Sequence, residues 1–280
     1  MEKEKKFYLL TDDLMFKMNF EKNLDALVIL AKKYIEELKD WDTPDKIIML
    51  PTENNNGIEI KSSRYDLKFK ALDKCFDFEM QETNPTYKLE DRFLKYYADL
   101  VVRAYPKGES YKHDLVYNLW FLNFKLYKDD EAIHTFKLKD KNGNYLNNSG
   151  SITIVEIEKF KNMNYNKDIW DRLLMVKEVK ELDSLKGADE IMDKVIKTCH
   201  DINDDAEMWR LLDEDYARRN IGAEKEAIAE KAMAKGMAKG LEEGSKTKAI
   251  EVAKNAKQMN LKVEDIIKLT GLSKEEIESL

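Results

Sequence analysis

The sequence is poor in the residues that build disulfide frameworks and structural zinc sites. Among its 280 residues only Cys75 and Cys199 are cysteines, and they lie far apart in the chain. Two distant thiols exclude a disulfide framework and are typical of proteins from a reducing compartment. The histidines at positions 113, 134 and 200 are scattered and lack the ligand spacing of a zinc site.

Long hydrophobic runs are missing as well. No stretch approaches the roughly 18 consecutive apolar residues of a membrane-spanning helix. The N-terminal residues, Met-Glu-Lys-Glu-Lys-Lys-Phe-Tyr, do not have the pattern of a secretory signal. We therefore expect a cytoplasmic protein without membrane contact. With 43% hydrophobic and 37% charged residues, the chain is expected to be soluble and globular, with one or two domains.

Positive charge is not in excess, since the formal net charge is −7 at pH 7. The total gives no indication of a nucleic-acid binder. It does not exclude one either, because local basic patches rather than the sum make the electrostatic footprint of such proteins.

The segment from Arg64 to Gln81 alternates apolar and polar residues almost perfectly. Alternation with a period of two predicts strands, and its interruption predicts a hairpin with the two-residue loop Asp73–Lys74. One predicted face is apolar and consists of Tyr65, Leu67, Phe69, Ala71, Phe76, Phe78 and Met80. The other is polar and consists of Asp66, Lys68, Lys70, Asp77, Glu79 and Gln81.

The polar face carries two carboxylates that this hairpin brings together. With the predicted loop, Asp66 lies opposite Gln81. Lys68 lies opposite Glu79, so Asp66 and Glu79 are diagonal neighbours with Cβ atoms about 7–8 Å apart. Carboxylates at that separation can bind one divalent cation, which prefers oxygen ligands. The alternative is a solvent-exposed face with cross-strand pairs of lysines and acidic residues, and periodicity alone leaves both interpretations open.

The remaining pattern predicts a mixed sheet with helices, and hence an α/β or α+β fold. A helix is expected to begin near Thr11 and continue to about Leu38, and another to cover 87–105. Strands are expected over 46–50, 114–124 and 151–159, in addition to the hairpin.

After Phe160 the composition changes and no strand pattern recurs. Helices with charged faces are predicted over 168–185, 188–199 and 206–217. We therefore divide the chain into a first domain over 1–160, a helical extension over 161–221 and a C-terminal region over 222–280.

The C-terminal region contains a short repeat with glycine at positions 236, 240 and 244. We predict a solvated helix or semi-flexible linker, because glycine costs a helix about 1 kcal/mol per site relative to alanine. Such a helix needs a partner, for example its own copy in a dimer. Residues 263–280 have a helix-turn-helix pattern. Glu275, Glu276 and Glu278 on its second helix disfavour contact with phosphates, so we expect a packing role.

In their order and spacing, several of these motifs resemble those of the PD-(D/E)XK nucleases, in the transposase-like Rpn branch. Asp66 followed by Glu79-x-Gln81 is similar to its metal motif. The first helix resembles its Asp-x-x-Phe-Lys-x-x-Phe pattern at Asp13, Phe16, Lys17 and Phe20. Later similarities are Arg92, Tyr96 and Tyr97; Gly108, Glu109 and Tyr111; Leu122 to Phe124; Glu156 to Phe160; and the Gly-Leu-Ser-Lys-Glu-Glu-Ile tail. No single motif is specific, but together they extend over most of the chain.

The resemblance implies a restriction-endonuclease-like mixed β-sheet core flanked by helices, followed by an all-helical C-terminal region. It also implies a Mg²⁺-dependent endodeoxyribonuclease, with Mn²⁺ as a substitute, that acts in recombination or transposition. Asp66, Glu79 and the Met80 carbonyl would hold the cation. Asp66, Glu79 and Gln81 would form the catalytic set. Relatives commonly have lysine at the position of Gln81. Glutamine can orient a water molecule but supplies no positive charge.

Further residues are expected to assist this set. Lys68, Lys70 or Arg92 can neutralise the phosphate, although Arg92 can equally well pair with a carboxylate. Asp12 or Asp13, and with less support Glu21, can add a carboxylate from the first helix. Helix capping accounts for the two aspartates at least as well.

Two functions therefore stay open. The first is a DNA endonuclease that forms a homo-oligomer through its C-terminal helices. The alternative is a catalytically silent nuclease-fold binding module whose C-terminal helices bind a partner. The acidic charge favours the second, and the set of Asp66, Glu79 and Gln81 favours the first. Finding Asp66 and Glu79 on opposite faces of the sheet would exclude the nuclease.

Overall fold

The computed structural model describes residues 5–52, 66–85, 87–105, 113–146, 149–162 and 168–280. It forms two compact units, Met1–Arg218 and Arg219–Leu280. The three-part division expected from composition stays a prediction. The predicted motif of Gly108, Glu109 and Tyr111, and the predicted face position of Tyr65, lie outside the described residues.

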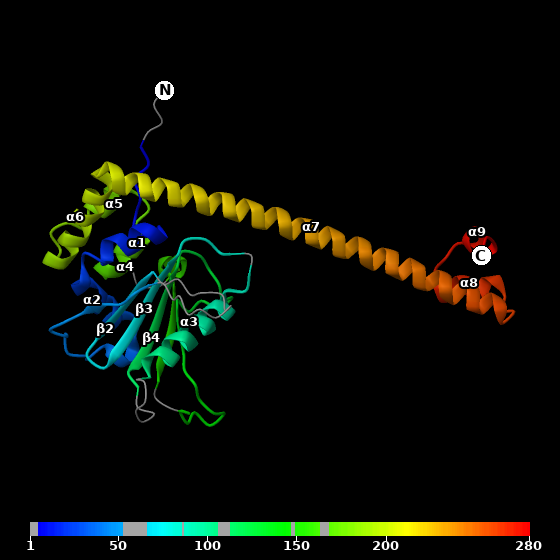
Figure 1. Cartoon of the computed structure of the whole chain (residues 1–280), viewed down its shortest axis with the longest axis horizontal. Helices are drawn as coiled ribbons and strands as arrows, with labels where there is room; N and C mark the ends of the chain where they lie inside the picture. The colour runs from blue at the N-terminus through cyan, green and yellow to red at the C-terminus, as the bar shows by residue number, and fades with distance from the viewer. Residues whose placement is uncertain (1–4, 53–65, 86, 106–112, 147–148, 163–167) are drawn as a thin grey trace. The chain divides into compact units, whose positions relative to one another are not determined.

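A six-stranded mixed sheet forms the centre of the first unit, in the order β1-β2-β3-β4-β6-β5 (Figure 1). β3, β4 and β6 are parallel, and the other neighbouring pairs are antiparallel. The strands are β1 (Ile48–Met49), β2 (Leu67–Ala71), β3 (Lys74–Gln81), β4 (Leu115–Leu122), β5 (Ile133–Phe136) and β6 (Gly150–Glu156). The carboxyl ends of β3, β4 and β6 therefore lie at one edge of the sheet.

Helices cover both faces of this sheet, as Figure 1 shows for α1 and α2 on one side and α3 on the other. The larger core packs the apolar hairpin face against helices that include α1 (Asp13–Phe20), α2 (Leu24–Tyr34) and α6 (Glu190–Asp204). The smaller core lies under α3 (Leu89–Ala104), whose buried side is Leu89, Phe93, Tyr96, Tyr97 and Leu100. The predicted mixed sheet flanked by helices is confirmed.

The hairpin forms as predicted, but its loop is Leu72–Asp73, because Ala71 pairs with Lys74. Leu72 adopts the left-handed conformation, with φ of 55°. The predicted loop, Asp73–Lys74, was based on the turn preference of aspartate and lies one residue after the observed loop. The side chains keep their predicted faces, because the partner of each residue changes by two and the side-chain period is two. Lys68 consequently pairs with Asp77, and the predicted pairing of Lys68 with Glu79 is wrong.

The solvent-exposed polar face considered for this hairpin is also wrong. Asp77 and Glu79 have no exposed surface, and Lys68 is 7% exposed. α3 lies over this face. A strand pattern does not show whether a helix from elsewhere covers the polar side.

Several predicted boundaries change. The expected first helix is split into α1, α2 and the short 3₁₀ helix η1 (Glu36–Leu38), with Asn23 preceding α2. The last predicted strand ends at Glu156, and η2 (Ile157–Asn162) follows it directly. Two helices replace the predicted helix over 168–185: α4 (Ile169–Met175) and α5 (Val179–Asp183). The edge strand β5 was not predicted, because only four residues form it.

α7 (Ala206–Gln258) is one continuous helix that enters the second unit, where a linker was one of the alternatives. The end of α7 packs with α8 (Val263–Thr270) and α9 (Lys274–Glu278) around Ala253, Ile266 and Ile277. Gly271 ends α8 in the left-handed conformation, and Ser273 forms a capping box for α9, as the helix-turn-helix pattern predicts. No helix of the described residues has the length and apolarity needed to cross a membrane.

Candidate active site

The candidate site lies at the carboxyl end of β3, under the first turns of α3. Asp66 immediately precedes β2, and its N–H donates to Glu79 Oε1 at 2.9 Å. In return, the Met80 N–H donates to Asp66 Oδ2 at 3.1 Å. The two carboxylates thus lie on neighbouring strands and share one end of the hairpin. Because the true register is two residues from the predicted one, Asp66 faces Glu79 more directly than the predicted diagonal.

The carbonyl of Met80 points toward the same side as Asp66. The Gln81 carbonyl accepts from the Asn123 N–H at 3.0 Å, on the β4 side. Peptide groups alternate direction along a strand, so the Met80 N–H and carbonyl face the β2 side. The hydrogen bond from Met80 to Asp66 agrees with this orientation.

Arg92, from the first turns of α3, bridges the side chains of Glu79 and Gln81 on β3. It donates to Glu79 Oε2 at 3.1 Å and to Gln81 Oε1 at 2.9 Å. Its guanidinium also lies 4.9 Å from the ring centre of Tyr96 and 5.0 Å from that of Trp120. The planar guanidinium suits such a forked, stacked position. Arg92 therefore pairs with a carboxylate, and a quarter of its side chain stays exposed.

Asp77 joins these residues, although its sequence position alone predicted no role in the site. It lies two residues before Glu79 on the same face of β3, fully buried. Asn118 Nδ2 donates to its Oδ2 at 2.6 Å, and Trp120 Nε1 donates in turn to the Asn118 side chain. Its position two residues before Glu79 was the available signal, because alternate residues of a strand share a face.

All three carboxyl groups are held in an unfavourable environment for negative charge. Burial, and then the charge of Glu79, raise the pKa of Asp66 well above its usual value. Burial, and then the charge of Asp77, raise the pKa of Glu79 likewise. Burial, and to a smaller extent the charge of Asp66, raise the pKa of Asp77. The environment of all three carboxyl groups therefore favours their protonated forms.

The aspartates of α1 have separate roles. Asp12 caps the helix by accepting from the Met15 N–H at 3.0 Å, so the capping alternative accounts for it. Asp13 Oδ1 accepts from the Glu82 N–H at 3.0 Å, one residue beyond β3. This bond fastens α1 to the site edge. Glu21 follows α1 and is exposed.

The two hairpin lysines point to other partners. Lys70 forms an ion pair with Asp114 at 2.5 Å, at the loop end of the hairpin. Lys68 lies opposite Asp77. Burial, and then the charge of Arg103 on α3, lower the pKa of Lys68. Lys70 is thus not brought to the site, and Lys68 lies two pairs further along the hairpin than Asp66.

The donor set fits a divalent cation. Two carboxylates and one main-chain carbonyl supply the hard oxygen ligands that Mg²⁺ prefers. Burial and the neighbouring carboxylates raise the pKa values of Asp66 and Glu79, and the charge of Arg92 opposes this rise only in part. No three His, Cys, Asp or Glu side chains of the described residues form a metal-binding group. A cation here would therefore depend on the main-chain oxygen and on water as well.

A comparison with protein-family models shows which family the chain belongs to. Residues 10–227 match the model of a family described as PD-(D/E)XK nuclease family transposase. The chain belongs to this family. Comparisons with curated proteins and with solved structures gave no match. Membership in the PD-(D/E)XK nuclease family transposases implies a nuclease-like function and agrees with the mixed sheet flanked by helices. Nucleases with this family's motif generally use divalent metals.

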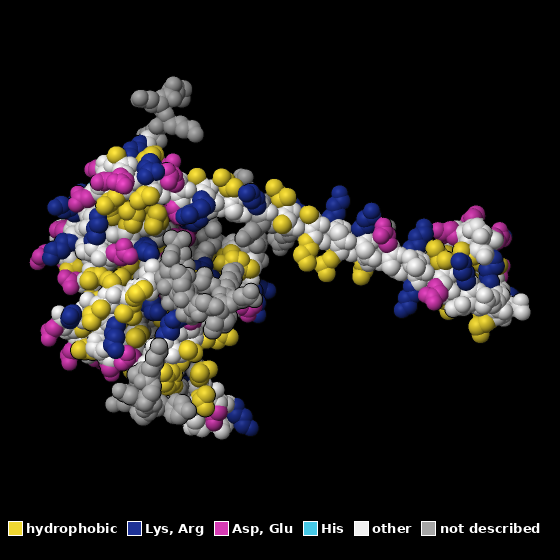
Figure 2. All heavy atoms as spheres, in the orientation of Figure 1, with side chains coloured by type: hydrophobic (Ala, Val, Ile, Leu, Met, Phe, Trp, Pro, Cys, Tyr) yellow, Lys and Arg dark blue, Asp and Glu magenta, His cyan; other side chains and the backbone are white. Residues whose placement is uncertain are grey.

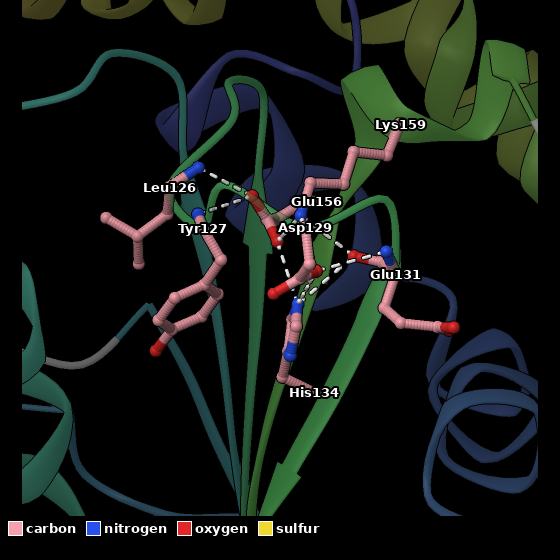
Figure 3. A network of polar contacts seen from close by, with 7 residues as sticks. All are labelled: Leu126, Tyr127, Asp129, Glu131, His134, Glu156 and Lys159. Carbon is pink, nitrogen blue, oxygen red and sulfur yellow. Dashed lines mark hydrogen bonds and ion pairs between the residues drawn. The ribbon is translucent and has the colours of Figure 1, made fainter.

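A second polar network of this PD-(D/E)XK chain lies at the carboxyl end of β6 (Figure 3). The buried Glu156 accepts from the Leu126 and Tyr127 N–H groups at 2.5 and 3.1 Å. Its other oxygen accepts from Lys159 Nζ at 2.7 Å. Figure 3 shows Lys159 and His134 directed at the same oxygens of Glu156, Asp129 and Glu131. The network fastens the loop after β4 to the edge that carries the candidate site.

Proposed function

We propose that the protein is a Mg²⁺-dependent endonuclease that hydrolyses DNA phosphodiester bonds, with Mn²⁺ as a substitute ion. The observation that carries the proposal is the pair of Asp66 and Glu79, whose carboxylates accept hydrogen bonds from the main chain of each other's strand. A family match over residues 10–227 supports it. The pair lies on one face of the sheet, so the arrangement that would exclude a nuclease does not occur.

Asp66, Glu79 and the Met80 carbonyl would hold the cation. When bound, the cation would polarise the phosphate and lower the pKa of an attacking water. Ligand carboxyl groups must be ionised to bind it, and burial raises the pKa values of Asp66 and Glu79, so loading would be coupled to proton release. Asp77 then supports the site from behind, through Asn118.

Gln81 and Arg92 act together in this proposal. The Gln81 amide accepts from Arg92 and donates to the Thr83 carbonyl at 2.9 Å, so its orientation is fixed. It retains one N–H and one lone pair with which to orient a water. Arg92 would stabilise the negative charge that develops on the phosphate.

The test is nicking of supercoiled plasmid in Mg²⁺, Mn²⁺ or EDTA by the wild type, Asp66→Ala and Glu79→Ala. We expect metal-dependent nicking that both substitutions abolish. Asp73→Ala is the matched control, because Asp73 lies at the exposed loop of the same hairpin. It should cut like the wild type. If the folded wild type binds a partner but does not cut DNA, the silent binding module is supported instead. The ion pair between Arg92 and Glu79 would then explain the lack of activity, because it occupies one of the proposed metal ligands.

We further propose that the C-terminal helices join two copies of the chain. Figure 2 shows hydrophobic side chains exposed along α7. Met233, Met237 and Leu241 are 68–80% exposed and lie one turn apart, next to a row of glycines at 236, 240 and 244. Such a surface permits close approach of a second helix. A dimer would present two sites, in keeping with a role in recombination or transposition. We expect this activity in the cytoplasm, with which two buried free thiols agree.

A further inference from the structure

The candidate site holds more carboxyl groups than cations, and a DNA phosphate would add negative charge. Asp66, Asp77 and Glu79 lie together at the end of the hairpin. The guanidinium of Arg92 already bonds three neighbouring side chains. It also approaches from the α3 side. A phosphate close to Asp66 therefore requires a further cation on the other side of this edge.

Lys17 of α1 lies on that side. Its Nζ donates to Thr52 Oγ1 at 3.4 Å. β1 and β2 are antiparallel, and the Leu50 N–H donates to the Lys68 carbonyl at 2.8 Å. Thr52 thus follows β1, the strand that pairs with β2, at the end of β2 that Asp66 precedes. Among the described residues the Lys17 ammonium forms this long hydrogen bond and no ion pair.

A rigid element holds Lys17 in this place. Asp13 fastens the start of α1 to the Glu82 N–H, and Phe16 and Phe20 are fully buried. Lys17 follows Asp13 by four residues, so both lie on the same face of the helix. The charges of Arg92 and Lys17 both oppose the rise in the pKa of Asp66. Lys17 is thus near enough to act on the site electrostatically.

We propose that Lys17 is a phosphate-binding residue of the active site, whose ammonium contacts a non-bridging oxygen of the DNA phosphate that approaches Asp66. This inference rests on the proposed DNA-cleaving function. An ammonium on a flexible stem can exchange its long bond to Thr52 for a charge-assisted bond to phosphate. It supplies the positive charge that Gln81, next to Glu79, does not.

The test measures DNA binding and cleavage separately. Binding of a fluorescent 30-base-pair duplex to the full chain is titrated in Ca²⁺ over a series of salt concentrations. Single-turnover cleavage is then measured in Mg²⁺. The variants are Lys17→Met and Lys17→Arg, with Lys22→Met as control, because Lys22 lies just beyond α1 and is exposed. Thermal unfolding followed by circular dichroism establishes that each variant folds.

We expect Lys17→Met to weaken binding and to reduce the slope of log K against log salt by about 0.9, the loss of one phosphate contact. Its cleavage rate should fall roughly 10- to 100-fold, the effect of one hydrogen bond to a charged group. Lys17→Arg should keep the salt slope even if Lys17→Met folds poorly. Lys22→Met should match the wild type.

The outcomes separate this inference from the proposed function. An unchanged slope and rate for Lys17→Met, in an active wild type, would overturn the role of Lys17 and leave the nuclease in place. If the wild type binds DNA without cutting it and Lys17→Met reduces the salt slope, the phosphate contact of Lys17 is supported and the proposed hydrolysis is overturned. A wild type that neither binds nor cuts DNA would overturn both.

Discussion

Negative charge on Asp66, Asp77 and Glu79 destabilises the folded protein, and the surrounding residues offset this destabilisation only in part. Burial in a low-dielectric environment disfavours each charge. The charge of Glu79 further raises the pKa of Asp66, and the charge of Asp77 that of Glu79. Arg92 offsets part of this cost at Glu79. Proteins commonly retain such destabilising clusters at active sites, because the same charges are needed for ligand binding.

The stability of the metal-free protein should reflect this cluster. The folded pKa values of Asp77 and Glu79 are raised above their unfolded values of roughly 4. Between those values the folded state binds more protons than the unfolded state, so this contribution to the free energy of unfolding falls as pH rises. Asp77→Asn should therefore stabilise the protein at pH 8 by about 1–3 kcal/mol, and much less at pH 5.

Urea unfolding in EDTA at pH 5 and pH 8 measures this effect as the difference between variant and wild type. Asp73→Asn is the control, since Asp73 is exposed at the hairpin loop and its substitution should change stability by less than about 0.5 kcal/mol. A destabilised Asp77→Asn at pH 8 would show that the Asp77 charge is compensated.

At this scale the sequence indicates the chemistry but not the surroundings. Alternation places Asp66 and Glu79 on one face, and the structure brings them together. The alternating pattern does not show that α3 covers this face, and so it does not predict the burial of Asp77 within the cluster. Lys17 was visible as part of a motif, but its distance from Asp66 depends on how α1 packs.

Among the elements, the junction between β6 and η2 depends on an ion pair at the end of the strand. Glu156 and Lys159 are almost completely buried, and the glutamate also accepts two N–H groups from the loop after β4. A buried pair that is fully bonded adds little net stability. Removing one partner is costly, because the other charge stays buried.

Glu156→Ala should lower the free energy of unfolding by about 3–5 kcal/mol, since it leaves the Lys159 ammonium without its buried carboxylate. The double variant Glu156→Leu, Lys159→Met should recover part of that loss. Urea denaturation of both variants at pH 7 tests this. A loss below 1 kcal/mol for Glu156→Ala would mean that Asp129 and the Glu131 carbonyl suffice for Lys159.

The prediction of elements succeeds where a periodic pattern is long. The amphipathic pattern of α3 and the apolar run of β4 appear within one or two residues of their predicted bounds. The prediction fails where one residue decides a turn. Leu72 occupies a left-handed position that its side chain does not favour, so the hairpin register could not be obtained from turn residues.

At the scale of the whole molecule, the long helix α7 raises the question of assembly. Gly236, Gly240 and Gly244 weaken a solvated helix, and a Cβ at each would meet nothing within 4 Å. The neighbouring Met233, Met237 and Leu241 are exposed. A helix of this composition gains stability when a second copy covers that side.

Met237→Glu should therefore convert a dimer into a monomer, because a carboxylate would be buried between the helices. Sedimentation equilibrium of the full chain measures the change in mass. Lys235→Glu, on another side of the helix, should leave the dimer intact. A wild type that is monomeric at all concentrations would contradict the proposed self-association.

The central claim is that Asp66, Glu79 and the Met80 carbonyl bind one divalent cation. The most direct measurement is a crystal structure of the full chain grown with Mn²⁺, located by its anomalous scattering. We expect one Mn²⁺ bonded to Asp66, Glu79 and the Met80 carbonyl, with Arg92 still beside Gln81. Anomalous density elsewhere, with the hydrogen bonds between Asp66, Glu79 and their strands unchanged, would contradict the proposed active site.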